Sequence, residues 1–138
     1  MKRVFILLLI SFLTVPVFAA QREECELCGM WIDQYMSTRH VVTLKDNKTK
    51  SFCSIACTAK HLEEHKGKLK DIKVADFLTK KLIDANSAYY LEGSDVPGVM
   101  SYISRIAFSA RRDAEQFQKK HGGRIITFKQ ALENQVSK

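Results

Sequence analysis

Apolar and polar positions alternate in two short stretches of the first half of the chain. These stretches are residues 39–44 and 49–52, and a polar turn over 45–48 separates them. Alternation on both sides of such a turn predicts a β-hairpin. Beyond it, apolar residues recur at helical spacing, so we expect a helix that ends near residue 65 and has Ser54 as its N-cap.

The same order of elements recurs in the second half of the chain. The expected strands there are residues 88–92, 102–108 and 124–128, the expected helices are 109–121 and 129–136, and residues 93–98 form a turn. A strand over residues 72–77 closes the first half. The pattern therefore predicts an α+β fold of two tandem ββαβ units, about 25–83 and about 84–138, packed through their sheets as one domain.

The first 19 residues have the pattern of a leader. Two basic residues, Lys2 and Arg3, precede an apolar run, and small residues follow at Val17 and Ala19. This pattern predicts a secretory signal peptide over residues 1–19. An uncleaved anchor helix is the alternative, but the run is shorter than the roughly 20 residues that a bilayer requires. Since no cysteine directly follows the small residues, we expect an exported, soluble, periplasmic protein without a lipid anchor.

The remaining 20–138 are enough for one domain with a hydrophobic core. Loss of the leader lowers the formal net charge from +7 to +5. A moderate positive charge favours solubility or docking on an acidic partner. The basic residues are scattered and no known motif frames them, so nucleic-acid binding is not expected.

All four cysteines lie in one stretch of the chain, with the spacing Cys-x2-Cys-x24-Cys-x3-Cys. They are Cys25, Cys28, Cys53 and Cys57. Sulfur donors at this density predict a metal site and favour Cu(I) or Zn²⁺ over hard cations. In an oxidising compartment two disulfides are the alternative. Pairs so close in sequence would close small loops and stabilise little, which favours the metal site.

The predicted elements place these cysteines in a treble-clef-like arrangement. Cys25 and Cys28 form a knuckle, a hairpin follows, and Cys53 and Cys57 stand at the start of a helix, where the dipole favours thiolate. Four thiolates would close a structural Zn²⁺ site. Met30 points instead to Cu(I), for which thioether sulfur is a suitable ligand, although a methionine at this position also suits core packing.

Three motifs, in order along the chain, carry a family resemblance. They are Cys25-x-x-Cys28-Gly29-Met30, then Asp84-Ala85-x-x-Ala88-Tyr89-Tyr90-x-x-Gly93-Ser94-Asp95-Val96-x-Gly98-x-Met100, and finally Phe108-x4-Asp113-Ala114-x-x-Phe117-x3-His121-Gly122-Gly123. Together they resemble the NosL family, whose members are exported copper-binding accessory proteins for the copper sites of nitrous oxide reductase.

The resemblance implies a duplicated ββαβ fold related in shape to organomercurial lyase. It also implies one Cu(I), bound through Cys28, Met30 and Met100, and a copper-accepting periplasmic enzyme or another copper protein as partner. We accordingly expect a copper chaperone without enzymatic activity. The chain departs from the family pattern at Val99 and Ser101, which flank Met100, and in its second cysteine pair.

Three other functions remain open from the sequence. A thiol oxidoreductase would need a thioredoxin-like context around Cys25 and Cys28, and a hairpin follows instead. A hydrolase or lyase would need an acid or base beside the thiols, and Asp33 is the nearby carboxylate. A structural zinc domain that binds a protein partner is the strongest alternative to copper delivery.

Overall fold

The computed structural model describes residues 22–65 and 67–136, so the predicted leader lies outside the described residues. In chain order the elements are η1 (Ile32–Tyr35), β1 (His40–Leu44), β2 (Thr49–Phe52), α1 (Ile55–Glu64), β3 (Leu69–Ala75), β4 (Leu82–Asp84), β5 (Tyr89–Glu92), β6 (Arg105–Phe108), α2 (Arg111–His121), β7 (Arg124–Ile126) and α3 (Phe128–Val136). None of the helices in this part of the chain is long and apolar enough to cross a membrane.

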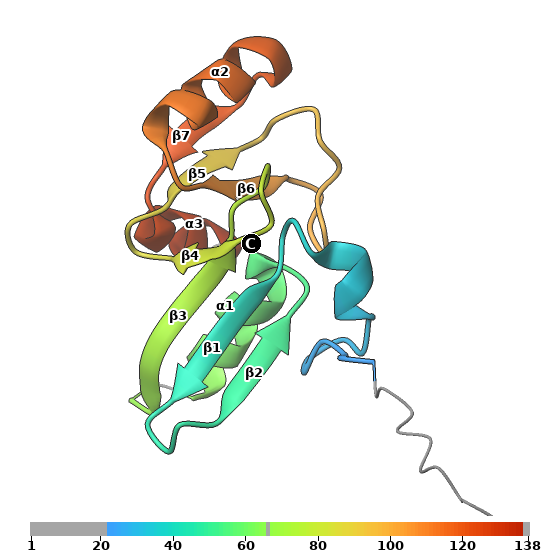
Figure 1. The fold of residues 1–138 in the computed structure, drawn as a ribbon, viewed down its shortest axis with the longest axis vertical. Coiled ribbons are helices and arrows are strands. Elements are labelled where there is room, and N and C mark those ends of the chain that lie inside the picture. Colours follow the sequence, from blue (N-terminus) through green and yellow to red (C-terminus); the bar gives the residue numbers. More distant parts are fainter. Residues whose placement is uncertain (1–21, 66, 137–138) are drawn as a thin grey trace, which may run out of the picture.

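The first sheet has the strand order β2-β1-β3-β4, and all its strands are antiparallel. The predicted hairpin is confirmed, with His40 opposite Phe52 on one side and Val74 on the other. These three residues and Val42 are buried, because alternate side chains of a strand point to the same face. Helix α1 lies along one face of this sheet (Figure 1).

Helix α1 begins after Ser54, as expected, but the predicted side-chain cap is wrong. The Ser54 side chain makes no capping hydrogen bond. Instead the hydroxyl of Thr58 donates to the Ser54 carbonyl at 2.9 Å. The start of α1 is therefore fixed by residues inside the helix and by the packing of Ile55, which is 3% exposed.

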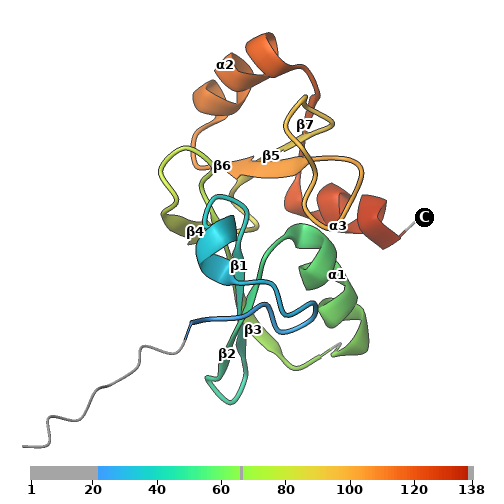
Figure 2. The same ribbon diagram turned by 90° about the vertical axis from the view of Figure 1, so that its right-hand side faces the viewer.

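The second sheet has the order β6-β5-β7, which repeats the order β2-β1-β3 of the first sheet. It lies between α2 and α3 (Figure 2). The expected strand over 102–108 is shorter, because β6 begins only at Arg105 and residues 93–104 form a long loop. The sheets follow the expected order of strands and helices, while the division into units near residue 84 stays a prediction.

One hydrophobic core joins the two sheets. It contains Ile55 of α1, Val74 of β3, Tyr90 of β5 and Phe128 of α3. Helix α1 packs against α3. A backbone hydrogen bond of 2.8 Å from Phe77 to Ala107 also links the segment after β3 to β6. The two halves thus bury a common core, as expected for units too small to be stable alone.

The buried carboxylate of Asp76 also links the segment after β3 to the segment after β6. Asp76 is 1% exposed and accepts hydrogen bonds from the backbone and hydroxyl of Thr79 and, at 2.7 Å, from the backbone N–H of Ser109. Burial alone would raise the pKa of Asp76, but these hydrogen bonds outweigh it and hold the pKa below its ordinary value.

Candidate metal centre

The first cysteine pair lies in a tight knuckle. The backbone N–H of Cys25 donates to the Met30 carbonyl at 2.8 Å, and Gly29 donates back to the Cys25 carbonyl at 2.9 Å. Gly29 has φ +73°, which a residue without Cβ adopts readily. Glu26 donates to the carbonyl of Ser51 in β2 at 3.0 Å. The knuckle is thereby held against the strand that leads to the second cysteine pair.

The structure brings the sulfur atoms of Cys25, Cys28, Cys53 and Cys57 within 4.8 Å of one another. Cys53 lies at the turn from β2 into α1, and Cys57 lies in the first turn of α1. The Sγ of Cys53 is 3.6 Å from that of Cys28 and 3.7 Å from that of Cys57. A metal with four sulfur ligands at about 2.3 Å in a tetrahedron separates them by about 3.8 Å. The cluster is therefore already close to the size of a thiolate-coordinated metal.

Burial separates one cysteine of the cluster from the other three. Cys25, Cys53 and Cys57 are at most 2% exposed, whereas Cys28 is half-buried. All four are free thiols in the structure, so it does not contain the disulfides of the alternative interpretation. Access from solvent to the cluster is through Cys28.

The crowding of the thiols changes their acidities in opposite directions. The pKa of Cys53 falls from 9.0 to about 6, because its sulfur accepts hydrogen bonds, first from Cys57 and then from Cys28. The pKa of Cys57 rises, because its thiol donates to Cys53 and is buried. Burial also raises the pKa of Cys28 to about 11. Among Cys28, Cys53 and Cys57, Cys53 has the lowest pKa and therefore ionises first, and Cys28 and Cys57 donate hydrogen bonds to its thiolate.

The structure places the two candidate methionine ligands differently. Met30 is half-buried and packs against the hydrophobic core that Cys25, Cys53 and Cys57 share with Ile32, Val42 and Phe52, as does Met36. Met100 lies in the loop over residues 93–104, and its side chain is 55% exposed and lines a surface hollow. Val99, directly before it, packs against the hydrophobic core that includes the three buried cysteines. Ligation by Met30 and Met100 stays a prediction.

His61 is near the cluster but is not among its possible ligands. It is 4% exposed, and its ring stacks on His65 at 4.1 Å and tilts against Phe52 at 4.9 Å. Burial lowers the pKa of His61. Its position four residues after Cys57 puts it on the same side of α1 as that cysteine, but its ring packs against aromatic side chains. His65 caps α1 by an Nδ1 hydrogen bond of 3.0 Å to the His61 carbonyl.

The carboxylate considered for a hydrolase or lyase is engaged elsewhere. Asp33 forms an exposed ion pair with Arg22, whose guanidinium also stacks over Trp31 at 5.2 Å.

One contact at the cluster was not expected from the sequence: the hydroxyl of Thr38 donates to the Cys53 carbonyl at 2.8 Å. Nothing in the sequence around Thr38 indicates this contact, because it depends on how η1 folds over the knuckle.

Comparison with known proteins gives a consistent result. The profile of the NosL family matches residues 16–136. The copper-binding lipoprotein NosL of Stutzerimonas stutzeri is 32% identical over 125 residues, which cover 83% of this chain and 65% of that protein. The HTH-type transcriptional repressor CutR of Bacillus subtilis (strain 168) is 26% identical over 125 residues, covering 90% of this chain and 65% of that protein. The chain thus spans just under two thirds of the length of these curated relatives.

A solved structure has the same fold. The crystal structure of the copper chaperone NosL from Shewanella denitrificans matches with a TM-score of 0.68 and 29% identity, covering 78% of this chain and 87% of that chain. The mixed helix-and-sheet architecture expected from the sequence is therefore confirmed by an independent structure.

Proposed function

The chain belongs to the NosL family, and on that premise we propose that it is an exported Cu(I)-binding protein that delivers copper to a periplasmic copper enzyme. The family resemblance makes nitrous oxide reductase the first candidate for that enzyme. In this proposal copper is the cargo, the chain catalyses no reaction, and its partners are proteins that donate or accept copper.

The four-sulfur cluster is the observation that carries the proposal. Its sulfur atoms lie within 4.8 Å of one another, and three of the four cysteines are buried. A site made only of sulfur selects soft ions such as Cu(I) and Zn²⁺. Two relatives are named for copper, and Met30 packs against the hydrophobic core that includes three of the cysteines, which together favour Cu(I).

The uneven burial of the cysteines suggests how the cargo leaves. A partner can approach only Cys28, because the other three thiols are covered by protein. Exchange then proceeds by a partner's sulfur replacing Cys28 while the buried thiolates still hold the ion. Copper passes from one protein to the other without release as a free ion.

A structural zinc site is the second candidate, and a specific observation favours it. Two cysteines from a knuckle and two from a helix start, with S–S distances of 3.6 and 3.7 Å, suit the closed four-thiolate site of a structural zinc domain. In that case the protein would bind a partner through its surface and would not exchange the ion.

Anaerobic titration with Cu(I) in the presence of a competing chelator, alone and against Zn²⁺, separates the two candidates. We expect one Cu(I) per chain, bound more tightly than Zn²⁺. Cys53→Ser should abolish tight binding because Cys53 lies between two other thiols. Met30→Leu should weaken it, and Met36→Leu, which replaces another methionine packed against the same hydrophobic core, is the matched control. If the protein keeps its Zn²⁺ when one equivalent of Cu(I) is added, copper delivery is refuted and the structural zinc role is supported.

A further inference from the structure

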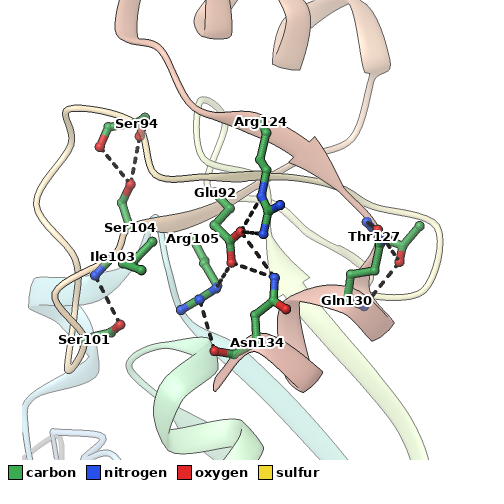
Figure 3. Close-up of polar contacts among 10 residues, drawn as sticks. All are labelled: Glu92, Ser94, Ser101, Ile103, Ser104, Arg105, Arg124, Thr127, Gln130 and Asn134. Carbon is green, nitrogen blue, oxygen red and sulfur yellow. Dashed lines mark hydrogen bonds and ion pairs between the residues drawn. The ribbon is translucent and has the colours of Figure 1, made fainter. Parts of the chain in front are cut away.

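A surface hollow of about 560 Å³ lies between the loop over residues 93–104 and helix α3. This volume is within the range of small-ligand sites. Its lining comprises Gly98 together with Met100, Ser101, Tyr102, Arg105, Asn134 and Gln135. Figure 3 shows Ser101, Arg105 and Asn134 of this lining with their polar contacts.

The loop that forms one wall of the hollow is held in shape by its own contacts. The hydroxyls of Ser94 and Ser104 are 2.9 Å apart and join its two ends. At the tip, the backbone N–H of Ile103 donates to the Ser101 hydroxyl at 3.3 Å. A Cβ at Gly98 would lie 2.0 Å from the Ser101 carbonyl oxygen, so the chain passes there only with glycine. The hollow is therefore formed before any ligand arrives.

A buried guanidinium lies at the base of the hollow. The Arg105 side chain is 3% exposed, its Nε donates to Glu92 at 2.7 Å and its Nη2 to the Asn134 carbonyl at 3.3 Å. Glu92 also accepts a hydrogen bond from Arg124, so one carboxylate faces two guanidinium groups. Glu92, Arg105 and Arg124 together therefore have a net charge of +1. Within the described part of the chain, Nη1 of Arg105 has no such bond and is available as a donor.

A second donor in the same lining has no partner. The Nε2 atom of Gln135 is buried and makes no hydrogen bond among the described residues. A buried donor without an acceptor costs about 1–3 kcal/mol, which a ligand would recover by supplying an oxygen. Two free donors beside a net positive charge call for a carboxylate rather than a neutral or cationic group.

The mouth of the hollow is apolar and unusually exposed. Tyr102 is fully exposed and Met100 is 55% exposed. Met100 has φ +56°, a backbone conformation uncommon outside glycine and typical of functional loops. Tyrosine and methionine are enriched in protein–protein interfaces. An occupant should therefore combine an apolar side chain at the mouth with a carboxylate at the base.

The hollow also borders the segment that carries Cys53. A narrow crevice shares Ser101, Arg105 and Gln135 with the hollow and is also lined by Thr38 and Ser54. The Thr38 hydroxyl donates to the Cys53 carbonyl, and Ser54 directly follows Cys53. A protein bound in the hollow would thus lie near the segment that carries one of the four cysteines.

We propose that the hollow over loop 93–104 and α3 is the docking site for an acidic segment of the protein with which this chain exchanges copper, a segment that carries a carboxylate next to an apolar side chain. The proposal rests on the proposed function for the identity of the partner. The chemistry of the occupant rests on Arg105, Gln135 and the exposed Tyr102 alone.

The probe is the peptide acetyl-Gly-Phe-Glu-Gly-amide, and its neutral match has Gln in place of Glu. Titration of the full chain, followed by ¹H–¹⁵N NMR, should give saturable shifts in residues 93–104 and in α3. The Glu peptide should bind about fivefold more tightly than the Gln peptide, since a charged acceptor strengthens the hydrogen bonds. Equal affinities, or shifts centred elsewhere on the molecule, would overturn the proposal. So would acetate that binds as tightly as the peptide.

Variants then locate the site. Tyr102→Ser and Gln135→Leu should each weaken the Glu peptide about threefold or more, because each removes one contact. Leu78→Ser, which removes another exposed apolar side chain (54% exposed), should leave the affinity unchanged. Unaltered affinity in both hollow variants would also exclude the site. A Cu(I) titration of the same samples separates the two proposals. If the chain binds copper but does not prefer the Glu peptide, only the docking proposal is refuted. If it binds the Glu peptide but not copper, only the proposed copper delivery is refuted.

Discussion

Glu92 is the residue whose replacement should most change the stability of the second half of the chain. Its carboxylate is 6% exposed and accepts hydrogen bonds from Arg105 and Arg124, both at 2.7 Å, and from the Asn134 side chain at 3.0 Å (Figure 3). It therefore ties β5 to β6, β7 and α3. Glu92→Gln keeps the size of the side chain and one acceptor oxygen. It removes the negative charge and places an amide NH₂ group, a donor, opposite the donor groups of the arginines and Asn134.

The expected cost follows from the exposure of the two arginines. Arg105 is 3% exposed, so without Glu92 its charge stays buried and unpaired, which costs about 3–5 kcal/mol. Arg124 is 68% exposed and can be solvated by water once Glu92 is replaced, so the loss of its ion pair costs at most about 1 kcal/mol of unfolding free energy. Glu92→Gln should therefore lose about 3–5 kcal/mol, and Tm should fall by roughly 4 °C for each kcal/mol in a domain of this size.

Urea unfolding followed by circular dichroism measures this cost, with Arg124→Gln as the matched control that should lose no more than about 1 kcal/mol. The double variant Glu92→Leu/Arg105→Met should be more stable than Glu92→Gln, since it leaves no unpaired charge. Equal losses in Glu92→Gln and Arg124→Gln would refute the reasoning, because they would mean that burial of Arg105 carries no penalty.

Three further predictions concern the junction, the loop and a buried histidine. Asp76→Asn should cost about 2–4 kcal/mol in urea unfolding, because the new amide faces the N–H of Ser109; a change below about 0.5 kcal/mol would contradict the hydrogen-bond scheme. Gly98→Ala should destabilise the chain by about 1–3 kcal/mol and weaken the Glu peptide, since its Cβ would meet the Ser101 carbonyl at 2.0 Å. Burial lowers the pKa of His40 from 6.5 to about 4. As the pH falls, the unfolded chain therefore binds the proton before the folded chain does. The free energy of unfolding should keep its full value above pH 6.5 and decrease between pH 6.5 and 4. An NMR titration midpoint of the His40 ring above pH 6 would exclude this.

The sequence predicted most elements because their signals are local. The hairpin of β1 and β2, helix α1 and the second-half helices follow from alternation, helical spacing and glycine stops. The short strand β4 and the turn η1 were not predicted, because both are too short to show a period and depend on contacts with distant residues. The strand expected from residue 102 begins at 105, because the hydroxyls of Ser94 and Ser104 close the loop before pairing starts.

The cysteine cluster could be predicted because spacing and element type together brought the two pairs to one point. The hollow could not, since Arg105 lies far from Asn134 and Gln135 in the sequence and none of the three belongs to a motif. Their meeting depends on α3 packing across β5. The Ser54 cap failed for a related reason: a serine before a helix indicates where the helix starts, but not whether its hydroxyl turns toward the backbone.

In the proposed function, holding and releasing one ion place opposite demands on the site, and the cluster offers different cysteines for each demand. Tight binding requires thiolates kept from water, and Cys25, Cys53 and Cys57 are buried between the knuckle, β2 and the start of α1. Release requires one ligand that another protein can replace, and only Cys28 is half-buried. If all four were equally buried, exchange would need the knuckle to open. Because one is not, the partner in the proposed function needs to reach only a single sulfur, and the fold can stay closed around the other three.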